Sequence, residues 1–138
     1  MNNLKFMRVN NEKFELIGDI NIDGNTILKK ELNEFITDKN NYCFVGIFEN
    51  VVVAFLYGYG MLRPDGKSMF YIHSVDVISE YQNRGIGTKL MEYVLKYIKN
   101  EKKYYKFLVL ADDDNIRACK VYQKYANKSK QVLFSSNI

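Results

Sequence analysis

The sequence predicts an α+β protein in which a mixed, mostly antiparallel sheet carries helices on both faces. The first half of the chain holds strand-like runs joined by short turns, as in an antiparallel meander. The second half alternates strand-like and helix-like segments, which favours parallel pairing. With 138 residues, 47% hydrophobic and 26% charged, the chain suits one core, so we expect a single domain over residues 1–138.

The first forty residues contain three candidate elements. Residues 6–9 are a candidate strand, and residues near 11–20 a candidate short helix. Apolar residues then recur at helical spacing from Thr26 to about Asp38, which predicts a helix with Thr26 as its N-cap.

A meander follows. Tyr42–Phe48 and Val51–Tyr59 are strand-like, and Glu49-Asn50 between them predicts a tight hairpin. The Pro-Asp-Gly turn at residues 63–66 leads into a third strand, Met69–Val77. These three strands form the antiparallel part of the predicted sheet.

The second half supplies two strand–helix units. Apolar residues at helical spacing predict a helix over Thr88–Asn100, and Lys106–Leu110 reads as a buried strand. After a turn at Asp112–Asn115, apolar residues between Ala118 and Tyr125 fall on one face of a last helix. Gln131–Ser135 is expected to close the sheet as a final strand.

Residues 82–87 form a glycine turn between a strand and a helix. Glycines let a backbone approach phosphate oxygens, and the free N–H groups of a first helical turn hold negative charge. This order predicts an anion site, although a short glycine motif before a helix is weak evidence by itself.

Charge is divided unevenly along the chain. Residues 1–83 hold 8 Lys/Arg and 11 Asp/Glu, a balance of −3, whereas residues 84–138 hold 12 and 5, a balance of +7. A polyanionic ligand at the glycine turn fits this division, and solvated helix faces explain the lysines equally well. No nucleic-acid-binding motif is present, so we expect no nucleic-acid partner.

Cysteine and histidine usage argues against disulfides and metal sites. Cys43 and Cys119 lie far apart, and His73 is the only histidine, so we expect no metal. The N-terminus lacks the apolar stretch of a signal peptide and no run is long enough to span a bilayer. These features predict a cytoplasmic protein with no membrane partner.

With this order of elements, residues 70–126 resemble the GNAT superfamily of N-acetyltransferases. Two motifs carry the resemblance. The first is a strand end, a tyrosine and a Gln-x-x-Gly-x-Gly loop; the second is a helix with Asn-x-x-Ala-x-x-apolar-Tyr-x-Lys. Their residues are Val75, Asp76, Val77, Tyr81 and 82–87, then Asn115, Ala118, Val121, Tyr122 and Lys124. The chain departs from the family at Ser79, usually proline, and at Ala126-Asn127, commonly Gly-Phe.

The resemblance implies acetyl transfer from acetyl-CoA to an amine, in a fold whose sheet splays open for the cofactor. It also implies which residues bind acetyl-CoA: Val75, Asp76, Val77, Gln82, Asn83, Arg84, Gly85, Ile86, Gly87, Thr88, Asn115 and Tyr122. The strand near Val75 would pair with the peptide-like pantetheine arm, and its N–H is the candidate oxyanion donor.

Two residues are candidates for proton transfer. Tyr122 matches the family's tyrosine and would protonate the leaving thiolate, although periodicity alone favours a core aromatic. His73, on the same strand face as Tyr71 and Val75 by alternation, is a candidate general base or a structural histidine. A water chain ending on Asp112 or Asp76 is the alternative base.

The segments around residues 70–77 and 111–122 are similar to the aminoglycoside 3-N-acetyltransferase branch. Asp112 and Asp113, after the second parallel strand, would then bind a small cationic amine, or act only as turn and helix-cap residues. A CoA-binding regulatory module without catalysis and a protein or peptide N-acetyltransferase are alternative functions. The sequence leaves a homodimer open.

Overall fold

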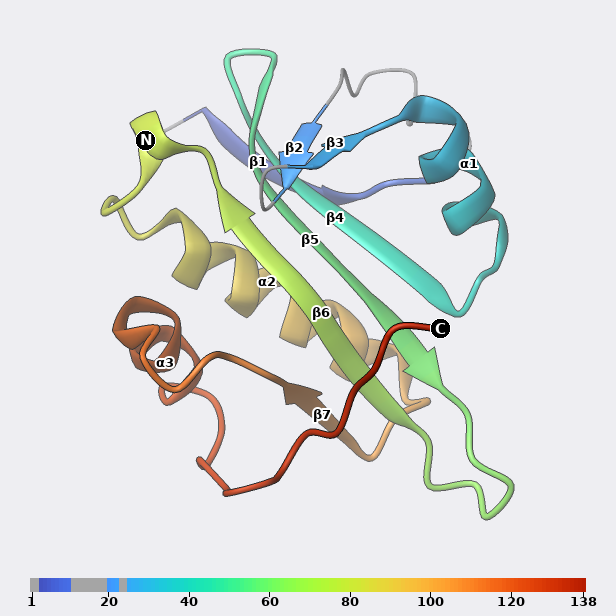
Figure 1. Cartoon of the computed structure of the whole chain (residues 1–138). Coiled ribbons are helices and arrows are strands. Elements are labelled where there is room, and N and C mark those ends of the chain that lie inside the picture. The colour runs from blue at the N-terminus through green and yellow to red at the C-terminus, as the bar shows by residue number, and fades with distance from the viewer. Residues whose placement is uncertain (1–2, 11–19, 23–24) are drawn as a thin grey trace.

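A computed structural model of the chain describes residues 3–10, 20–22 and 25–138. Its central sheet contains β1 (Leu4–Arg8), β4 (Asn41–Phe48), β5 (Val51–Met61), β6 (Met69–Val77) and β7 (Lys106–Val109). The strand order is β1-β4-β5-β6-β7 (Figure 1), with β6 and β7 parallel and the other neighbours antiparallel. The predicted mixed, mostly antiparallel sheet is confirmed.

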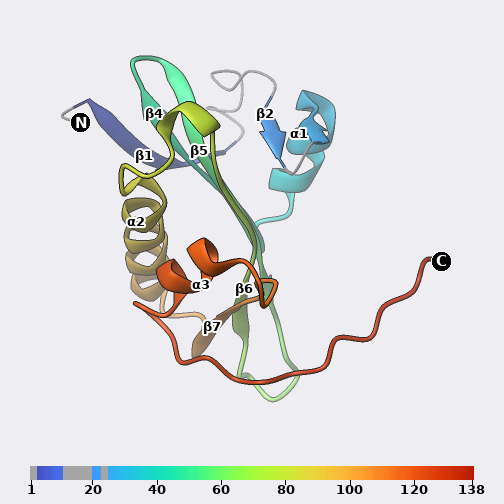
Figure 2. The ribbon, with the colours of Figure 1, turned by 60° about the vertical axis from the view of Figure 1, so that its left-hand side comes forward.

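Helices cover both faces of the sheet, as predicted (Figure 2). α2 (Ile86–Glu101) and α3 (Ile116–Tyr122) lie on one face, and α1 (Lys29–Thr37) lies on the other with a small hairpin of β2 (Ile20–Ile22) and β3 (Asn25–Ile27). Each face therefore has its own core. Fully buried α2 residues such as Leu90 pack on the inner strands, and Leu32 of α1 packs on the opposite side.

Most predicted elements are present. The turn Glu49-Asn50 has positive φ at both residues, as a tight two-residue hairpin requires. Strand β6 has the predicted bounds, and α2 begins two residues before the predicted start at Thr88. A 3-10 helix, η2 (Ser79–Tyr81), connects β6 to the glycine turn.

Three predictions about these elements are wrong, and one lies outside the described residues. The strand at residues 106–110 is present as β7, but it is not buried, because Lys106 and Leu110 are exposed and the residues between them are half-buried. Thr26 is not a helix cap: it lies in β3, and α1 begins at Lys29 without a side-chain cap. Gln131–Ser135 does not close the sheet, because residues 127–138 form no strand and are exposed. The candidate helix near 11–20 falls mostly on residues 11–19, which are not among those described.

A β-bulge in β6 changes which residues share a face. Tyr57 pairs with Ser74 while Gly58 pairs with Ile72, so His73 is an extra residue on its strand. His73 therefore lies with the rings of Tyr57 and Tyr59 on the α1 side, whereas Val75 packs into the α2 core. The expectation that His73 and Val75 share a face is wrong for this reason.

The parallel pair of strands separates halfway along. Paired residues run only from Met69–Lys106 to Ile72–Val109, and β6 continues to Val77. Residues 73–77 consequently have β5 on one side and no β7 partner on the other. This opening between the two strands, called the wedge below, begins directly at His73.

The C-terminal residues 127–138 project from the rest of the molecule. After α3 the chain runs past the end of β7 and extends outward on the α1 side of the sheet (Figure 2). None of the described helices is long and apolar enough to cross a membrane.

Candidate active site

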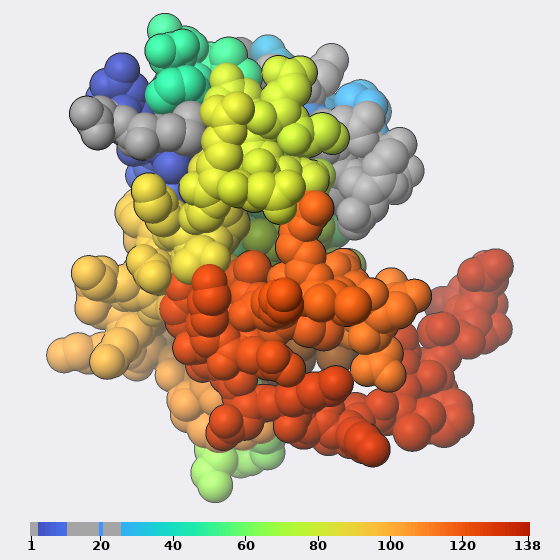
Figure 3. All heavy atoms as spheres, turned by 90° about the vertical axis from the view of Figure 1, so that its left-hand side faces the viewer, coloured from blue at the N-terminus to red at the C-terminus, as the bar shows by residue number. Residues whose placement is uncertain are grey.

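A groove of about 480 Å³ lies beside the wedge. Its walls come from the end of β6, the loop after η2, the first turn of α2 and one face of α3 (Figure 3). Eleven of the twelve predicted cofactor residues line it: Val75, Asp76, Val77, Gln82, Asn83, Gly85, Ile86, Gly87, Thr88, Asn115 and Tyr122. The structure thus brings together residues that are up to 47 positions apart in the chain.

Arg84 is the predicted cofactor residue that does not line the groove. Its guanidinium lies over the ring of Tyr81, with the Cζ atom 5.1 Å from the ring centroid. A cation held against an aromatic face in this way mainly fixes the loop.

The first turn of α2 is suited to an anion. Gly85 is the N-cap residue in a left-handed conformation, with φ of 79°, and makes no side-chain cap hydrogen bond. The N–H groups of Ile86, Gly87 and Thr88 have no acceptor within the helix, as in any first turn. No acidic residue lies in this turn. The positive end of the helix dipole therefore faces the groove without a carboxylate in its own first turn, although Asp76 lines the groove from β6.

Gln82 links the parts of the groove to one another. Its Nε2 donates a hydrogen bond to the Val77 carbonyl at 2.8 Å, and its Oε1 accepts one from Arg117 Nη1 at 2.5 Å. One side chain thereby joins the end of β6 to α3. This explains structurally why a glutamine begins the loop.

Sequence reasoning missed two basic residues of the site. Arg117 and Lys120 line the groove from α3, and Lys124 Nζ donates to Thr88 Oγ1 at 3.4 Å nearby. Arg117 and Lys120 are three residues apart on the helix that follows Asn115. The sequence could have predicted them, because residues three apart share a helical face and this half of the chain is basic.

The two predicted residues of α3 have different environments. Asn115 caps the helix, since its Oδ1 accepts a hydrogen bond from Ala118 N at 3.1 Å, and it also lines the groove. Tyr122, in the last turn, lines the groove and packs at the margin of the α2 core. Both interpretations of Tyr122, core aromatic and site residue, therefore describe part of its surroundings.

His73 lies on the other side of the sheet from α2, where the wedge begins. Its Nδ1 is 2.9 Å from the Tyr59 hydroxyl, and its ring contacts those of Tyr57, Tyr59 and Tyr71 at centroid distances of 4.9–5.6 Å. Burial, with the nearby phenols of Tyr57 and Tyr71, raises the pKa of Tyr59, so its hydroxyl stays protonated near neutral pH. We call Tyr57, Tyr59, Tyr71 and His73 the aromatic shelf.

Asp112 and Asp113 follow β7 but do not line the groove. The Asp112 carbonyl accepts from Asn115 N at 3.0 Å, in the predicted turn. The Asp113 carboxylate lies 3.5 Å from Lys128 Nζ on the exposed surface. Among the described residues no group of three or more His, Cys, Asp or Glu side chains is arranged to hold a metal ion.

Comparison with known proteins identifies the class. The chain matches the Acetyltransferase (GNAT) family over residues 10–126. It belongs to this family of acyltransferases, and both motifs lie within the matched residues. No curated protein is similar to it in sequence.

Solved structures with the same fold come from several acetyltransferases. An aminoglycoside acetyltransferase, meta-AAC0020, from an uncultured soil metagenomic sample, in complex with trehalose, has a TM-score of 0.80 at 22% identity, covering 99% of this chain and 97% of that chain. AAC(6')-Iy in complex with a bisubstrate analogue has a TM-score of 0.76 at 14% identity, covering 98% of each chain. A ribosomal-protein-alanine N-acetyltransferase from Brucella melitensis biovar Abortus 2308 has a TM-score of 0.72 at 12% identity, covering 98% and 99%. At these identities the likeness concerns the fold.

Proposed function

We propose that the chain transfers an acetyl group from acetyl-CoA to the amine of a small cationic molecule. The observation that carries the proposal is the groove that joins an uncapped helix N-terminus to an open strand edge. The helix end fits a pyrophosphate, and the edge of β6 beyond Ile72, where pairing with β7 has ended, fits a peptide-like pantetheine arm as an added strand. Arg117 and Lys120 add positive charge to the same groove.

Tyr122 and His73 supply the proton transfers in this proposal. The neutral amine attacks the thioester carbonyl carbon, the carbon–sulfur bond breaks, and Tyr122 gives its proton to the departing thiolate. His73 takes the proton that the amine nitrogen loses. The backbone N–H near Val75 stabilises the intermediate oxyanion. Tyr122 lines the groove and His73 lies where the wedge opens on the opposite face, so the acceptor approaches from the aromatic shelf.

A pair of matched tyrosine variants tests the catalytic role of Tyr122. Tyr122→Phe is expected to lower kcat by roughly 10²-fold while the affinity for acetyl-CoA is unchanged, because one donor is lost only as the thiolate leaves. Tyr125→Phe is the control, since its hydroxyl bonds to Glu92 and to the Thr88 carbonyl and Tyr125 does not line the groove. Wild-type turnover in Tyr122→Phe would make it a core residue only.

The acceptor class is tested separately. Asp112 and Asp113 lie at the carboxyl end of β7, and the aromatic shelf can hold a cation against its rings. We expect Asp112→Asn to raise KM for a polycationic amine more than for a monocationic one. Asp65→Asn, in a remote turn beside Arg63, is the control.

A panel of aminoglycosides, polyamines and peptides, assayed by mass spectrometry of the acetylated product, decides among the alternatives. Products from peptides alone would favour a protein N-acetyltransferase, the activity named for one structural neighbour. Binding of acetyl-CoA without any product across the panel would favour a regulatory CoA-binding module.

A further inference from the structure

Asp76 places a carboxylate near the open edge of β6. Its two neighbours, Val75 and Val77, pack into the α2-side core. Side chains alternate along a strand, so the Asp76 side chain belongs to the opposite, α1 side. Its pairing with Phe55, a residue of the α1-side core, gives the same direction, because paired residues of adjacent strands point to one face. Asp76 therefore shares this face with His73 and the rest of the aromatic shelf.

Asp76 is also one of the residues that line the groove. Beside it the pairing of β6 with β7 has already ended, so the groove reaches the strand edge at this residue. The other charged residues of the groove, Arg117 and Lys120, are basic and suit a polyanion. A carboxylate carried to the opposite face leaves that positive charge to the cofactor. Asp76 therefore lies where a cationic acceptor would meet the cofactor.

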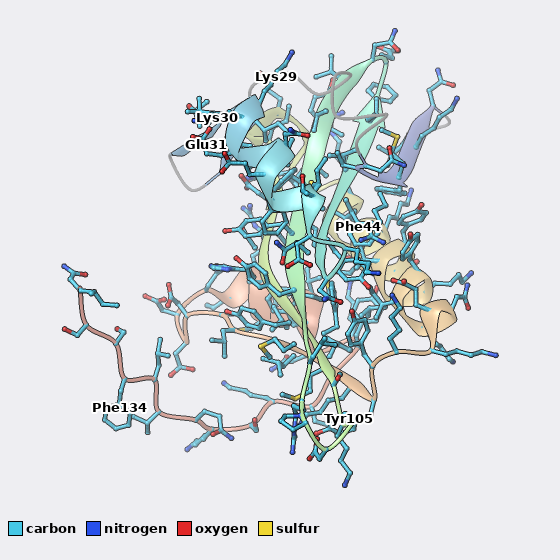
Figure 4. The ribbon with its side chains drawn as sticks, turned by 90° about the vertical axis from the view of Figure 1, so that its right-hand side faces the viewer. Lys29, Lys30, Glu31, Phe44, Tyr105 and Phe134 are labelled. Atoms are coloured by element: carbon cyan, nitrogen blue, oxygen red, sulfur yellow. The ribbon has the colours of Figure 1, made fainter. Side chains whose placement is uncertain are left out.

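Partial burial distinguishes Asp76 from most other carboxylates. Among the described Asp and Glu side chains only Asp76 and Glu101 are not exposed, and Glu101 lies at the end of α2 that is far from the groove. The charged residues Lys29, Lys30 and Glu31 lie on the outer side of α1, away from the sheet (Figure 4). Salt screens an ion pair at a half-buried site less than one in water. A cation at Asp76 is therefore held more firmly than one at the exposed aspartates after β7.

We propose that Asp76 binds a second, non-reacting ammonium group of the acceptor, and that the acceptor is therefore a compact diamine. This inference rests on the proposed acetyl transfer. Val75, whose N–H stabilises the oxyanion in that proposal, directly precedes Asp76, and neighbouring residues are about 3.3 Å apart along a strand. Two nitrogens joined by two or three carbons are roughly 4–5 Å apart, since each bond is about 1.5 Å long. An acceptor with that spacing reaches both positions.

The carboxylate of Asp76 also selects which nitrogen carries the proton. Two charged amino groups in a compact diamine repel each other, so the second proton is held weakly. Asp76 attracts the protonated nitrogen, which leaves the other nitrogen neutral for attack on the thioester carbonyl carbon. That nitrogen loses its own proton to His73, the carbon–sulfur bond breaks, and the thiolate takes its proton from Tyr122. The ammonium group on Asp76 is unchanged by the reaction.

Matched amines, compared in wild type and Asp76→Asn, test this role. Trimethylenediamine and butylamine have nearly the same size and differ in one terminal ammonium group. We expect the ratio of their kcat/KM values, diamine over monoamine, to fall roughly 10-fold in Asp76→Asn, because a charge-assisted hydrogen bond is lost. The basicities of the two amines cancel in this comparison between proteins. The ratio for hexamethylenediamine over heptylamine should change little, because its nitrogens are too far apart.

Two controls accompany the amine comparison. Asp65→Asn removes a carboxylate from a remote exposed turn and should keep the wild-type ratio. The affinity for acetyl-CoA, measured by calorimetry, should be the same in Asp76→Asn and wild type, because the carboxylate faces the acceptor. Retained affinity also shows that the variant is folded. Asp76→Ser, with a smaller side chain, should give the same result as Asp76→Asn.

The possible outcomes separate this inference from the proposed function. Equal losses for trimethylenediamine and butylamine in Asp76→Asn would overturn the inference, since Asp76 would then act as a base on every amine. Tighter acetyl-CoA binding in that variant would overturn it as well, because the carboxylate would face the cofactor. Loss of acetyl-CoA binding in both Asp76 variants would make Asp76 a structural residue only. Acetylation of no amine by the wild-type protein would overturn the proposed acetyl transfer, and the inference with it.

Discussion

His73 lies where the wedge begins, within the aromatic shelf from which the acceptor would approach in the proposed function. Its Nδ1 is 2.9 Å from the Tyr59 oxygen, so a proton on Nδ1 can be donated to that oxygen. This tautomer leaves the Nε2 lone pair free for the amine. The phenol of Tyr59 stays protonated because burial raises its pKa. In the proposed mechanism Tyr59 would therefore position the imidazole.

The two residues should differ in the size of their effects. His73→Gln is expected to lower kcat/KM by roughly 10²-fold, because the proposed general base is lost. Tyr59→Phe should lower kcat/KM less, because it removes only the hydrogen-bond partner of the imidazole. Measurement of kcat/KM for both variants with one amine checks this. Wild-type kcat/KM in His73→Gln would transfer the base role to a carboxylate or water chain.

The two cysteines provide a second test at the residue scale. Burial raises the pKa of the Cys43 thiol, which is fully enclosed in the α1-side core, whereas Cys119 is partly exposed on α3. At neutral to mildly alkaline pH we expect native protein to react with one equivalent of an aromatic disulfide reagent, and unfolded protein with two. Cys119→Ser should leave none in the native state. Rapid native labelling of two thiols would contradict the burial of Cys43.

At the scale of elements, the glycine turn can be tested with two matched glycines. Gly85 and Gly66 both have φ of 79°, and neither has an atom within 4 Å of an added Cβ. Alanine at either should cost about 1 kcal/mol of folding free energy for the left-handed backbone. Only Gly85 lines the groove, so only Gly85→Ala should weaken acetyl-CoA binding. Urea unfolding measures the folding free energy and calorimetry measures the affinity for acetyl-CoA. If both alanine variants bind acetyl-CoA with equal affinity, the glycine turn does not contact the cofactor.

The bulge in β6 depends on the close approach of Gly58. A Cβ on Gly58 would lie 2.3 Å from the Tyr71 carbonyl oxygen, whereas one on Gly46 would meet side-chain atoms, the Phe6 ring at 3.0 Å and Ala54 Cβ at 3.3 Å. Backbone cannot move aside as a side chain can, so Gly58→Ala should destabilise the fold by about 3 kcal/mol and Gly46→Ala by less. Urea unfolding measures both. Similar losses of folding free energy in the two variants would mean that the backbone at the bulge can move to accommodate a Cβ atom.

Pattern was sufficient to predict most elements. Helix α2 buries one face, and β4 and β5 are nearly continuous apolar runs because they are buried on both faces. The groove residues followed from two motifs whose spacing the fold preserves. The prediction of Thr26 as a helix cap was wrong because residues 25–27 pair with residues 20–22 as a strand. A search for helical periodicity does not detect such a pairing. The predicted face of Val75 was wrong because one β-bulge moves the following side chains to the opposite face of the sheet.

Across the whole molecule, the wedge connects two surfaces of different character. The groove on the α2 and α3 side is basic through Arg117 and Lys120, and the aromatic shelf on the α1 side has three phenols and one imidazole. The cofactor and the acceptor would therefore enter from opposite faces and meet within the sheet. This arrangement separates their binding sites while keeping the reacting groups together.

Because β6–β7 pairing ends at Ile72, the wedge should be detectable by hydrogen exchange in the protein without ligand. Backbone amides of residues 73–77 that face the wedge lack a neighbouring strand, so they should exchange their hydrogens with solvent much faster than amides of residues 69–72. Bound acetyl-CoA, acting as the absent strand, should slow that exchange at the wedge while leaving β4 nearly unchanged. Deuterium uptake followed by mass spectrometry would show it. Uptake across residues 73–77 that is independent of ligand would place the pantetheine arm elsewhere.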